Sequence, residues 1–147
     1  MGNWALQPAP FARFSGLSIL PHMVTYRQLK QVENGRILPT RLKWCDSFGS
    51  KLRGFTFRRT LSPTDGLVLV EKADTRVNTA IHMFFVFFDL GVIWVNDGGE
   101  VVDMVVARPW RPSYMPQAPA RYVIELHPSL LPQVKIGDHL QFLEKEV

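Results

Sequence analysis

The sequence predicts a mainly β protein, a compact β-sandwich or barrel of about eight short strands with one short helix. Short runs rich in β-branched and aromatic residues recur along the chain, and clusters of Gly, Pro, Asn and Asp separate them. Three of these clusters hold Asn-Gly or Asp-Gly steps, which favour hairpin turns. A chain of 147 residues, 46% hydrophobic and 20% charged, suits one folded core. We therefore expect residues 23–147 to form a single β-rich domain.

A hairpin is expected at the start of this domain. Val24–Gln31 and Arg36–Trp44 read as strands on either side of the Asn34-Gly35 turn. Because proline cannot donate a hydrogen bond to a strand ladder, Pro39 indicates an edge or a bulge in the second strand.

A short helix and several further strands follow the hairpin. Asp46-Ser47 can cap a helix over residues 48–53, and Gly54 would end it. The proline-rich segment 108–119 can sustain neither a strand nor a helix, so we expect an ordered loop there. The remaining expected elements are strands at 67–70, 81–88, 92–95, 100–106, 121–126 and 139–143, with a helical turn at 128–134.

The most apolar stretch of the chain is IHMFFVFFDLGVIWVND, residues 81–97. Asp89 and Gly91 divide it, and each piece is far shorter than the ~20 residues that cross a bilayer. We therefore expect two interior strands covered on both faces, not a membrane anchor.

Residues 1–22 do not share this strand pattern. They hold Pro8, Pro10 and Pro21, and they lack the basic start and continuous apolar core of a secretory signal. We expect them to form a loosely ordered extension.

Charge is distributed unevenly along the chain. Residues 23–62 carry nine Lys/Arg and two acidic residues, whereas residues 63–147 carry seven basic and eleven acidic residues. A basic surface can attract nucleic acid, but solvent-facing strand positions also favour lysine and arginine, and no aromatic-and-basic strand motif of the RNA-binding type occurs. We expect no nucleic-acid partner, and a monomer or weak homo-oligomer.

The cysteine and histidines offer no recognisable metal or redox motif. Cys45 is the single cysteine, so an intramolecular disulfide is excluded and a reducing, cytoplasmic setting is the simplest. We expect Cys45 to be a small packed residue. The four histidines show no ligand spacing. We therefore expect no metal and no cofactor.

Five short motifs, in order, resemble a known family. They are Leu52-Arg53-Gly54-Phe55 with Arg58 and Leu61, Ile81-His82-Met83-Phe84-Phe85-Val86, Leu90-Gly91-Val92-Ile93-Trp94, Tyr122-Val123-Ile124-Glu125-Leu126, and Ile136-Gly137-Asp138. They are similar to the patterns R-x-x-G-L-M-x-R-x-x-L, I-H-T-F-F-M, I-D-V-V-F, V-L-E-L and G-L-x-x-G-D of the DUF192 family, a domain of unknown function in bacteria and archaea. The resemblance implies a compact, mostly β domain, but it implies no activity, because that family is uncharacterised.

The chain departs from the family pattern near its most apolar stretch. The family usually has proline, any residue and aspartate where this chain has Asp89, Leu90 and Gly91. If the family's aspartate were catalytic, Gly91 could not replace it, although Asp89 lies two residues earlier. Val86 replaces the family's methionine and keeps that position apolar.

Aromatic and polar residues near the proline-rich loop suggest a binding site. We expect His82, Trp110, Tyr114 and Arg121 to border a pocket for a small polar ligand, such as a saccharide or a carboxylate. The expected function is a non-enzymatic binding or accessory domain.

Glu125 is an acidic residue between apolar neighbours of a predicted strand. A buried carboxylate needs a partner, and we expect a structural ion pair with Arg53 or Arg121. The alternative is a hydrolase or lyase that uses Glu125 or Asp89 with His82. That enzyme would require the groups to converge within hydrogen-bond reach in one cleft.

Overall fold

The computed structural model describes residues 24–144, so the extension expected at residues 1–22 lies outside the described residues. One sheet of seven strands, in the order β5-β4-β6-β3-β2-β1-β7, forms the body of the molecule. The strands are β1 (Tyr26–Gln31), β2 (Arg41–Cys45), β3 (Asp65–Thr75), β4 (Leu90–Val95), β5 (Val101–Ala107), β6 (Ala120–Leu126) and β7 (Leu140–Glu144). Only β2 and β3 pair in parallel among them.

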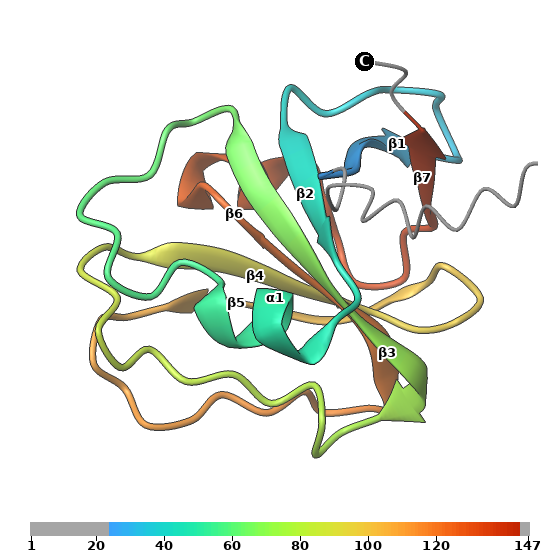
Figure 1. Cartoon of the computed structure of the whole chain (residues 1–147). Coiled ribbons are helices and arrows are strands. Elements are labelled where there is room, and N and C mark those ends of the chain that lie inside the picture. Colours follow the sequence, from blue (N-terminus) through green and yellow to red (C-terminus); the bar gives the residue numbers. More distant parts are fainter. Residues whose placement is uncertain (1–23, 145–147) are drawn as a thin grey trace, which may run out of the picture.

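The sheet curls into a half-barrel, and β1 and β7, the last two strands in its order, lie together at the upper right of Figure 1. An isolated bridge between Glu100 and His139 brings the starts of the two edge strands, β5 and β7, together. Closing part of the barrel in this way reduces the length of exposed strand edge. The predicted mainly β class is confirmed, in the form of a curled sheet.

The short helix α1 (Phe48–Arg53) lies in the connection between β2 and β3. Its cap follows the sequence, because Ser47 accepts a hydrogen bond from the Ser50 backbone N–H at 3.3 Å and Gly54 ends the helix with a positive φ of 31°. The 3₁₀ element η1 (Pro128–Gln133) matches the predicted helical turn. The connection through α1 is a crossover, which the parallel pairing of β2 with β3 requires, since a tight hairpin joins only antiparallel strands.

Two apolar layers cover the two faces of the sheet. Inside the curl, Ile93, Ile124 and Leu126 pack with residues of β1, β7 and η1. On the other face, Val123 and Trp94 pack with residues of the long loops, 76–89 and 108–119. Neighbouring residues of β4 and β6 point to opposite layers, as the period of a strand dictates.

The strand predicted at Ile81–Phe88 is wrong. Only Ile81 pairs, through an isolated bridge to Tyr114, and Phe85 has a positive φ of 59° that no strand contains. The interior of the sheet is formed by other strands, among them β4 and β6. This segment therefore lies on the face of the sheet and not in it. Ile81, Met83 and Val86 are buried against that face, whereas Phe84, Phe85 and Phe87 are exposed to 42%, 45% and 50%.

Candidate functional site

Glu125 lies near the end of β6 (Ala120–Leu126), between two apolar neighbours on adjoining strands. Its Cα partners are Leu67 of β3 and Val92 of β4. Since residues two apart in a strand share a face, Glu125 points to the same side as Val123, into the layer beneath the long loops. Only 7% of Glu125 is exposed. The fold therefore directs a carboxyl group into an apolar layer.

The burial of Glu125 changes its acidity. Loss of hydration raises the pKa of its carboxyl to about 7, because the charged form is destabilised in apolar surroundings. Burial is the sole cause of this shift, and no described residue forms an ion pair with the carboxyl. Buried polar groups normally have partners, so an unpartnered carboxyl of this kind marks a candidate site.

A cavity of about 200 Å³ opens beside Glu125. Apolar walls come from Phe55, Leu69, Ile81, Val86 and Leu90. Hydrogen-bonding groups come from four different parts of the chain: α1, the loop after it, β3 and the loop before β4. They are Lys51, Thr56, Glu71, Asn78 and His82. The cavity thus combines a mainly apolar surface with a few convergent polar groups, as ligand sites do.

One ion pair lies at the side of this cavity. Lys51 Nζ is 2.7 Å from Glu71 Oε1, and their side chains are only 23% and 19% exposed. The ammonium group is therefore committed to Glu71. Glu125 gains no counterion from it.

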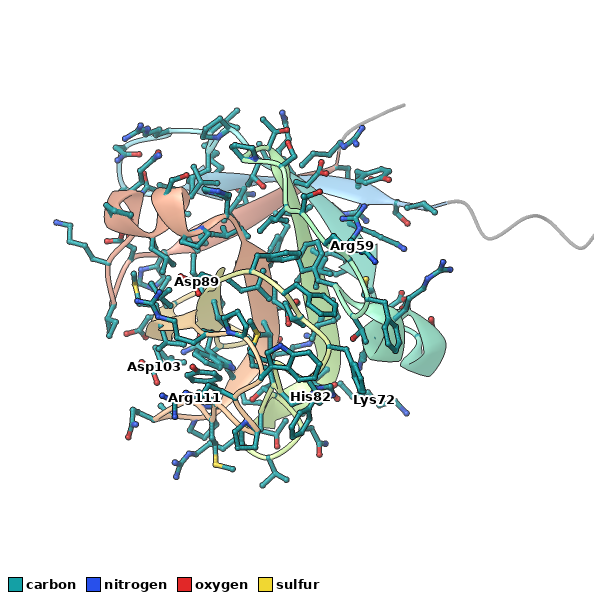
Figure 2. The ribbon with its side chains drawn as sticks, turned by 90° about the vertical axis from the view of Figure 1, so that its left-hand side faces the viewer. Arg59, Lys72, His82, Asp89, Asp103 and Arg111 are labelled. Carbon is teal, nitrogen blue, oxygen red and sulfur yellow. The ribbon has the colours of Figure 1, made fainter. Side chains whose placement is uncertain are left out.

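His82, one of the expected ligand-binding residues, lines the same cavity as Glu125. Its ring stacks on Phe84 with the ring centres 5.5 Å apart. No hydrogen bond among the described residues joins His82 to Glu125. Asp89 instead forms an ion pair with Arg108, and Figure 2 shows Asp89 well apart from His82. The groups of the enzyme alternative therefore do not converge as a hydrogen-bonded set.

The other three expected ligand-binding residues lie elsewhere. Trp110 packs edge-to-face against Phe85 and Phe87 at the surface. The hydroxyl of Tyr114 accepts a hydrogen bond from the Arg108 backbone N–H at 2.9 Å. Both residues hold the loops together, and neither lines the Glu125 cavity.

The ion pair expected for Glu125 is not formed in the described part of the chain. Arg121 pairs with Asp97 and donates from Nε to the Glu71 carbonyl at 2.9 Å. Arg53 lines a different cavity. The physical reason is position. Arg121 lies at the opposite end of β6 from Glu125, and Arg53 is exposed at the end of α1, where its guanidinium keeps its hydration.

Three exposed aromatic residues share an unusual backbone conformation. Phe57, Phe85 and Trp110 have φ values of 65°, 59° and 64°, a left-handed region that bulky residues seldom adopt. Their rings contact one another in a row, with ring centres 5.0 Å apart for the tilted pair Phe57–Phe85 and 5.3 Å for the edge-to-face pair Phe85–Trp110. Such conformations cluster at functional sites, and Phe57 and Phe85 directly follow or precede the cavity residues Thr56 and Val86.

Cys45 is buried, with 1% exposed, and packs in the layer beneath the loops. Burial raises the pKa of its thiol, which lowers the fraction of reactive thiolate. The prediction of a packed cysteine is confirmed.

Sequence reasoning identified Glu125 and His82 but missed Lys51, Thr56 and Asn78 as their neighbours. Nothing in the local pattern distinguishes those three from ordinary surface residues. They meet only because α1 and the loop before β4 cover the same part of the sheet.

Known proteins place this small, mainly β domain in an uncharacterised class. The chain belongs to the DUF192 family, described as an uncharacterized ACR, whose model matches residues 29–142. The "UPF0127 protein PF1050" of Pyrococcus furiosus is 32% identical over 113 residues, which cover 76% of this chain and 94% of that protein. A UPF0127 protein of Thermococcus sibiricus is 34% identical over 114 residues, which cover 76% of this chain and 72% of that protein.

Solved structures share the fold. A crystal structure from Sinorhizobium meliloti 1021, provisionally assigned as a transcription regulator, has a TM-score of 0.69 at 19% identity, over 80% of this chain and 92% of that one. A protein of unknown function from Novosphingobium aromaticivorans has a TM-score of 0.68 at 16% identity, over 80% and 84% of the two chains. At these identities the likeness concerns the fold alone.

The described residues show neither a membrane-spanning helix nor a cluster of metal ligands. No helix between residues 24 and 144 is long and apolar enough to span a membrane. Within the same residues, no group of three or more His, Cys, Asp or Glu side chains is arranged to hold a metal ion.

Proposed function

We propose that this protein binds a small hydroxylated molecule, of the size of a monosaccharide, in the cavity beside Glu125, without chemical conversion. The observation that carries the proposal is the carboxyl of Glu125, which is buried, unpartnered among the described residues and directed at a cavity. A ligand hydroxyl can both donate to and accept from a carboxyl group, so it would satisfy Glu125 in either protonation state.

The size and lining of the cavity support this ligand class. A volume of about 200 Å³ lies below the roughly 300–1,000 Å³ of drug-sized pockets, so the ligand must be small. The Phe55 ring offers an apolar surface to the C–H face of a sugar. Asn78, Thr56 and His82 add donors and acceptors around it. A carboxylate ligand is disfavoured here, because it would meet the carboxyl of Glu125 while the lysine of the lining, Lys51, is already paired with Glu71.

Ligand-observed NMR of the full chain against a panel of monosaccharides and small polyols tests the proposal. We expect saturation transfer to at least one panel member, lost in Glu125→Leu, which removes the polar group and keeps the bulk. Glu125→Gln keeps a donor and an acceptor, and should retain weaker binding. Glu100→Gln, an exposed position on the β4–β5 hairpin, is the matched control and should bind as the parent does.

Three outcomes would overturn the proposal. The first is the absence of binding across the panel at millimolar concentrations. The second is unchanged binding by a folded Glu125→Leu variant, with folding verified by circular dichroism. The third is consumption of a panel member in the NMR sample, which would instead indicate the hydrolase or lyase alternative with His82.

A further inference from the structure

A second cavity lies on the other side of the segment Gly54–Thr56. It has a volume of about 660 Å³ and is bordered by β1, β2, the start of β3 and the loop that follows α1. The two cavities share Gly54, Phe55 and Thr56 as a common wall. This larger cavity has the dimensions of a site for a small organic molecule.

The walls of the second cavity are strongly basic. Arg41, Lys43, Arg53 and Arg58 line it, with Asp65 as the single acidic residue. Arg41 is 3.8 Å from Asp65, at the limit of an ion pair. The other three cations form no ion pair with any described residue.

A solvated strand face does not account for this group of cations. Arg41 and Lys43 come from β2, Arg53 from the end of α1, and Arg58 from the following loop. Three successive elements of the chain therefore bring like charges around one concavity, which costs electrostatic free energy. Such a cost is offset when an anion occupies the space between them.

Aromatic rings hold two of the guanidinium groups. Arg41 lies over the Tyr26 ring at 4.7 Å from its centre, and Arg58 lies over the Phe55 ring at 5.5 Å. Stacking uses the flat face of a guanidinium and leaves its N–H edge free for an oxyanion. Held in this way, the two groups lose less side-chain entropy when they bind an anion.

We propose that this second cavity binds a small organic molecule that carries at least two negative charges on phosphate or carboxylate groups. Lys43 and Arg53 supply charge-assisted hydrogen bonds, and stacked Arg41 and Arg58 orient the oxyanions. A nucleic acid is a poorer match, since the cations surround a concavity and do not follow a groove. This site is independent of the hydroxylated ligand proposed for the Glu125 cavity.

Isothermal titration calorimetry of the full chain with pyrophosphate and with citrate tests the proposal and distinguishes phosphate from carboxylate ligands. We expect binding of at least one probe that weakens between about 20 and 200 mM NaCl, because salt screens exposed charges. Lys43→Gln and Arg53→Gln should each weaken binding about tenfold or more, the typical effect of losing a charged hydrogen bond. Arg59→Gln, beside Arg58 but outside the cavity lining, should bind as the parent does.

The absence of heat with both probes at low salt would overturn the proposal. Equal weakening by Arg59→Gln and Lys43→Gln would do so too, because it would indicate attraction to net charge alone. Glu125→Leu should leave pyrophosphate and citrate binding unchanged, and Lys43→Gln should leave sugar binding unchanged. The two proposals can thus fail separately.

Discussion

Lys51 donates to Glu71 at 2.7 Å, although Glu125 lines the same cavity and lacks a partner among the described residues. The pairing follows from position, because α1 carries Lys51 toward β3, where Glu71 lies. One carboxylate of the cavity is thereby neutralised and fixed. The other stays available to a ligand.

The Lys51–Glu71 pair should contribute measurably to stability. We expect a double-mutant cycle of Lys51→Met and Glu71→Gln to give a coupling free energy of about 1 kcal/mol, because both side chains are mostly shielded from water. The control cycle is Arg41→Met with Asp65→Asn, whose parent side chains are 57% and 33% exposed and 3.8 Å apart. Its coupling should be close to zero. Urea denaturation measures both, and equal couplings would contradict the prediction.

Glu125 should make stability depend on pH. Its carboxyl has a pKa of about 7 when folded and a usual value of 4.5. Below pH 4.5 the group is protonated in both states, so the folded protein bears no penalty. Between pH 4.5 and about 7 the unfolded chain releases this proton while the folded protein keeps it, so stability falls across this window and levels off above it.

We expect the free energy of unfolding of the parent to fall by roughly 3 kcal/mol relative to Glu125→Gln between pH 4.5 and 8, as the size of the pKa difference implies. Other titrating groups cancel in this comparison, because both proteins contain them. Urea denaturation at intervals of pH provides the measurement. A difference that stays constant over this range would show that Glu125 is not held neutral. If Glu125→Gln fails to fold, Glu125→Leu serves as the reference.

Trp94 fixes the loop before β4 through one buried hydrogen bond. Its Nε1 donates to the Thr79 carbonyl at 2.8 Å, and both residues are 1% exposed. Trp94→Phe leaves that carbonyl unpaired and should cost about 1–3 kcal/mol of stability, with a further loss from reduced volume. Trp110→Phe, at a 48% exposed position, should change stability by less than about 0.5 kcal/mol. Thermal unfolding compares the two variants, and similar changes in both would contradict this account.

Gly66 is required by close packing beneath β2. A Cβ at this position would lie 2.6 Å from Leu42 Cδ2 and 2.9 Å from the Glu125 carbonyl oxygen. Gly66→Ala should therefore destabilise the protein by about 1–3 kcal/mol, as overpacking does. Gly49→Ala is the control of opposite sign: no atom lies within 4 Å of the added Cβ, and alanine favours helix α1 by up to about 1 kcal/mol. Denaturant midpoints decide the prediction, which fails if Gly66→Ala is neutral.

The local elements could be predicted where short-range chemistry alone determines them. Ser47 and Gly54 delimit α1 as expected, and Gly35 and Gly99 turn with φ values of 69° and 88°. A glycine or a capping hydroxyl acts within a few residues, so its effect is visible in the sequence. The segment 81–88 could not be assigned in this way. Its aromatic residues favour a strand, but the strands of the sheet pair with one another and leave this segment on its face.

The candidate sites were predictable only in part. An acidic residue between apolar neighbours of a predicted strand singled out Glu125. Its partners could not be predicted: Arg53 lines the neighbouring cavity, and Lys51 binds Glu71. The basic cavity was visible only as an excess of Lys and Arg in residues 23–62.

By itself the sequence determined the β class, the turns, the helix ends and the family, since each depends on residues near one another in the chain. The tertiary structure decided that β2 pairs in parallel with β3, that the segment 81–88 lies on the sheet, and that two cavities share the wall Gly54–Thr56. These features depend on which distant elements compete for the same surface. Burial of apolar area is not directional, so the choice is made by the packing of the whole chain.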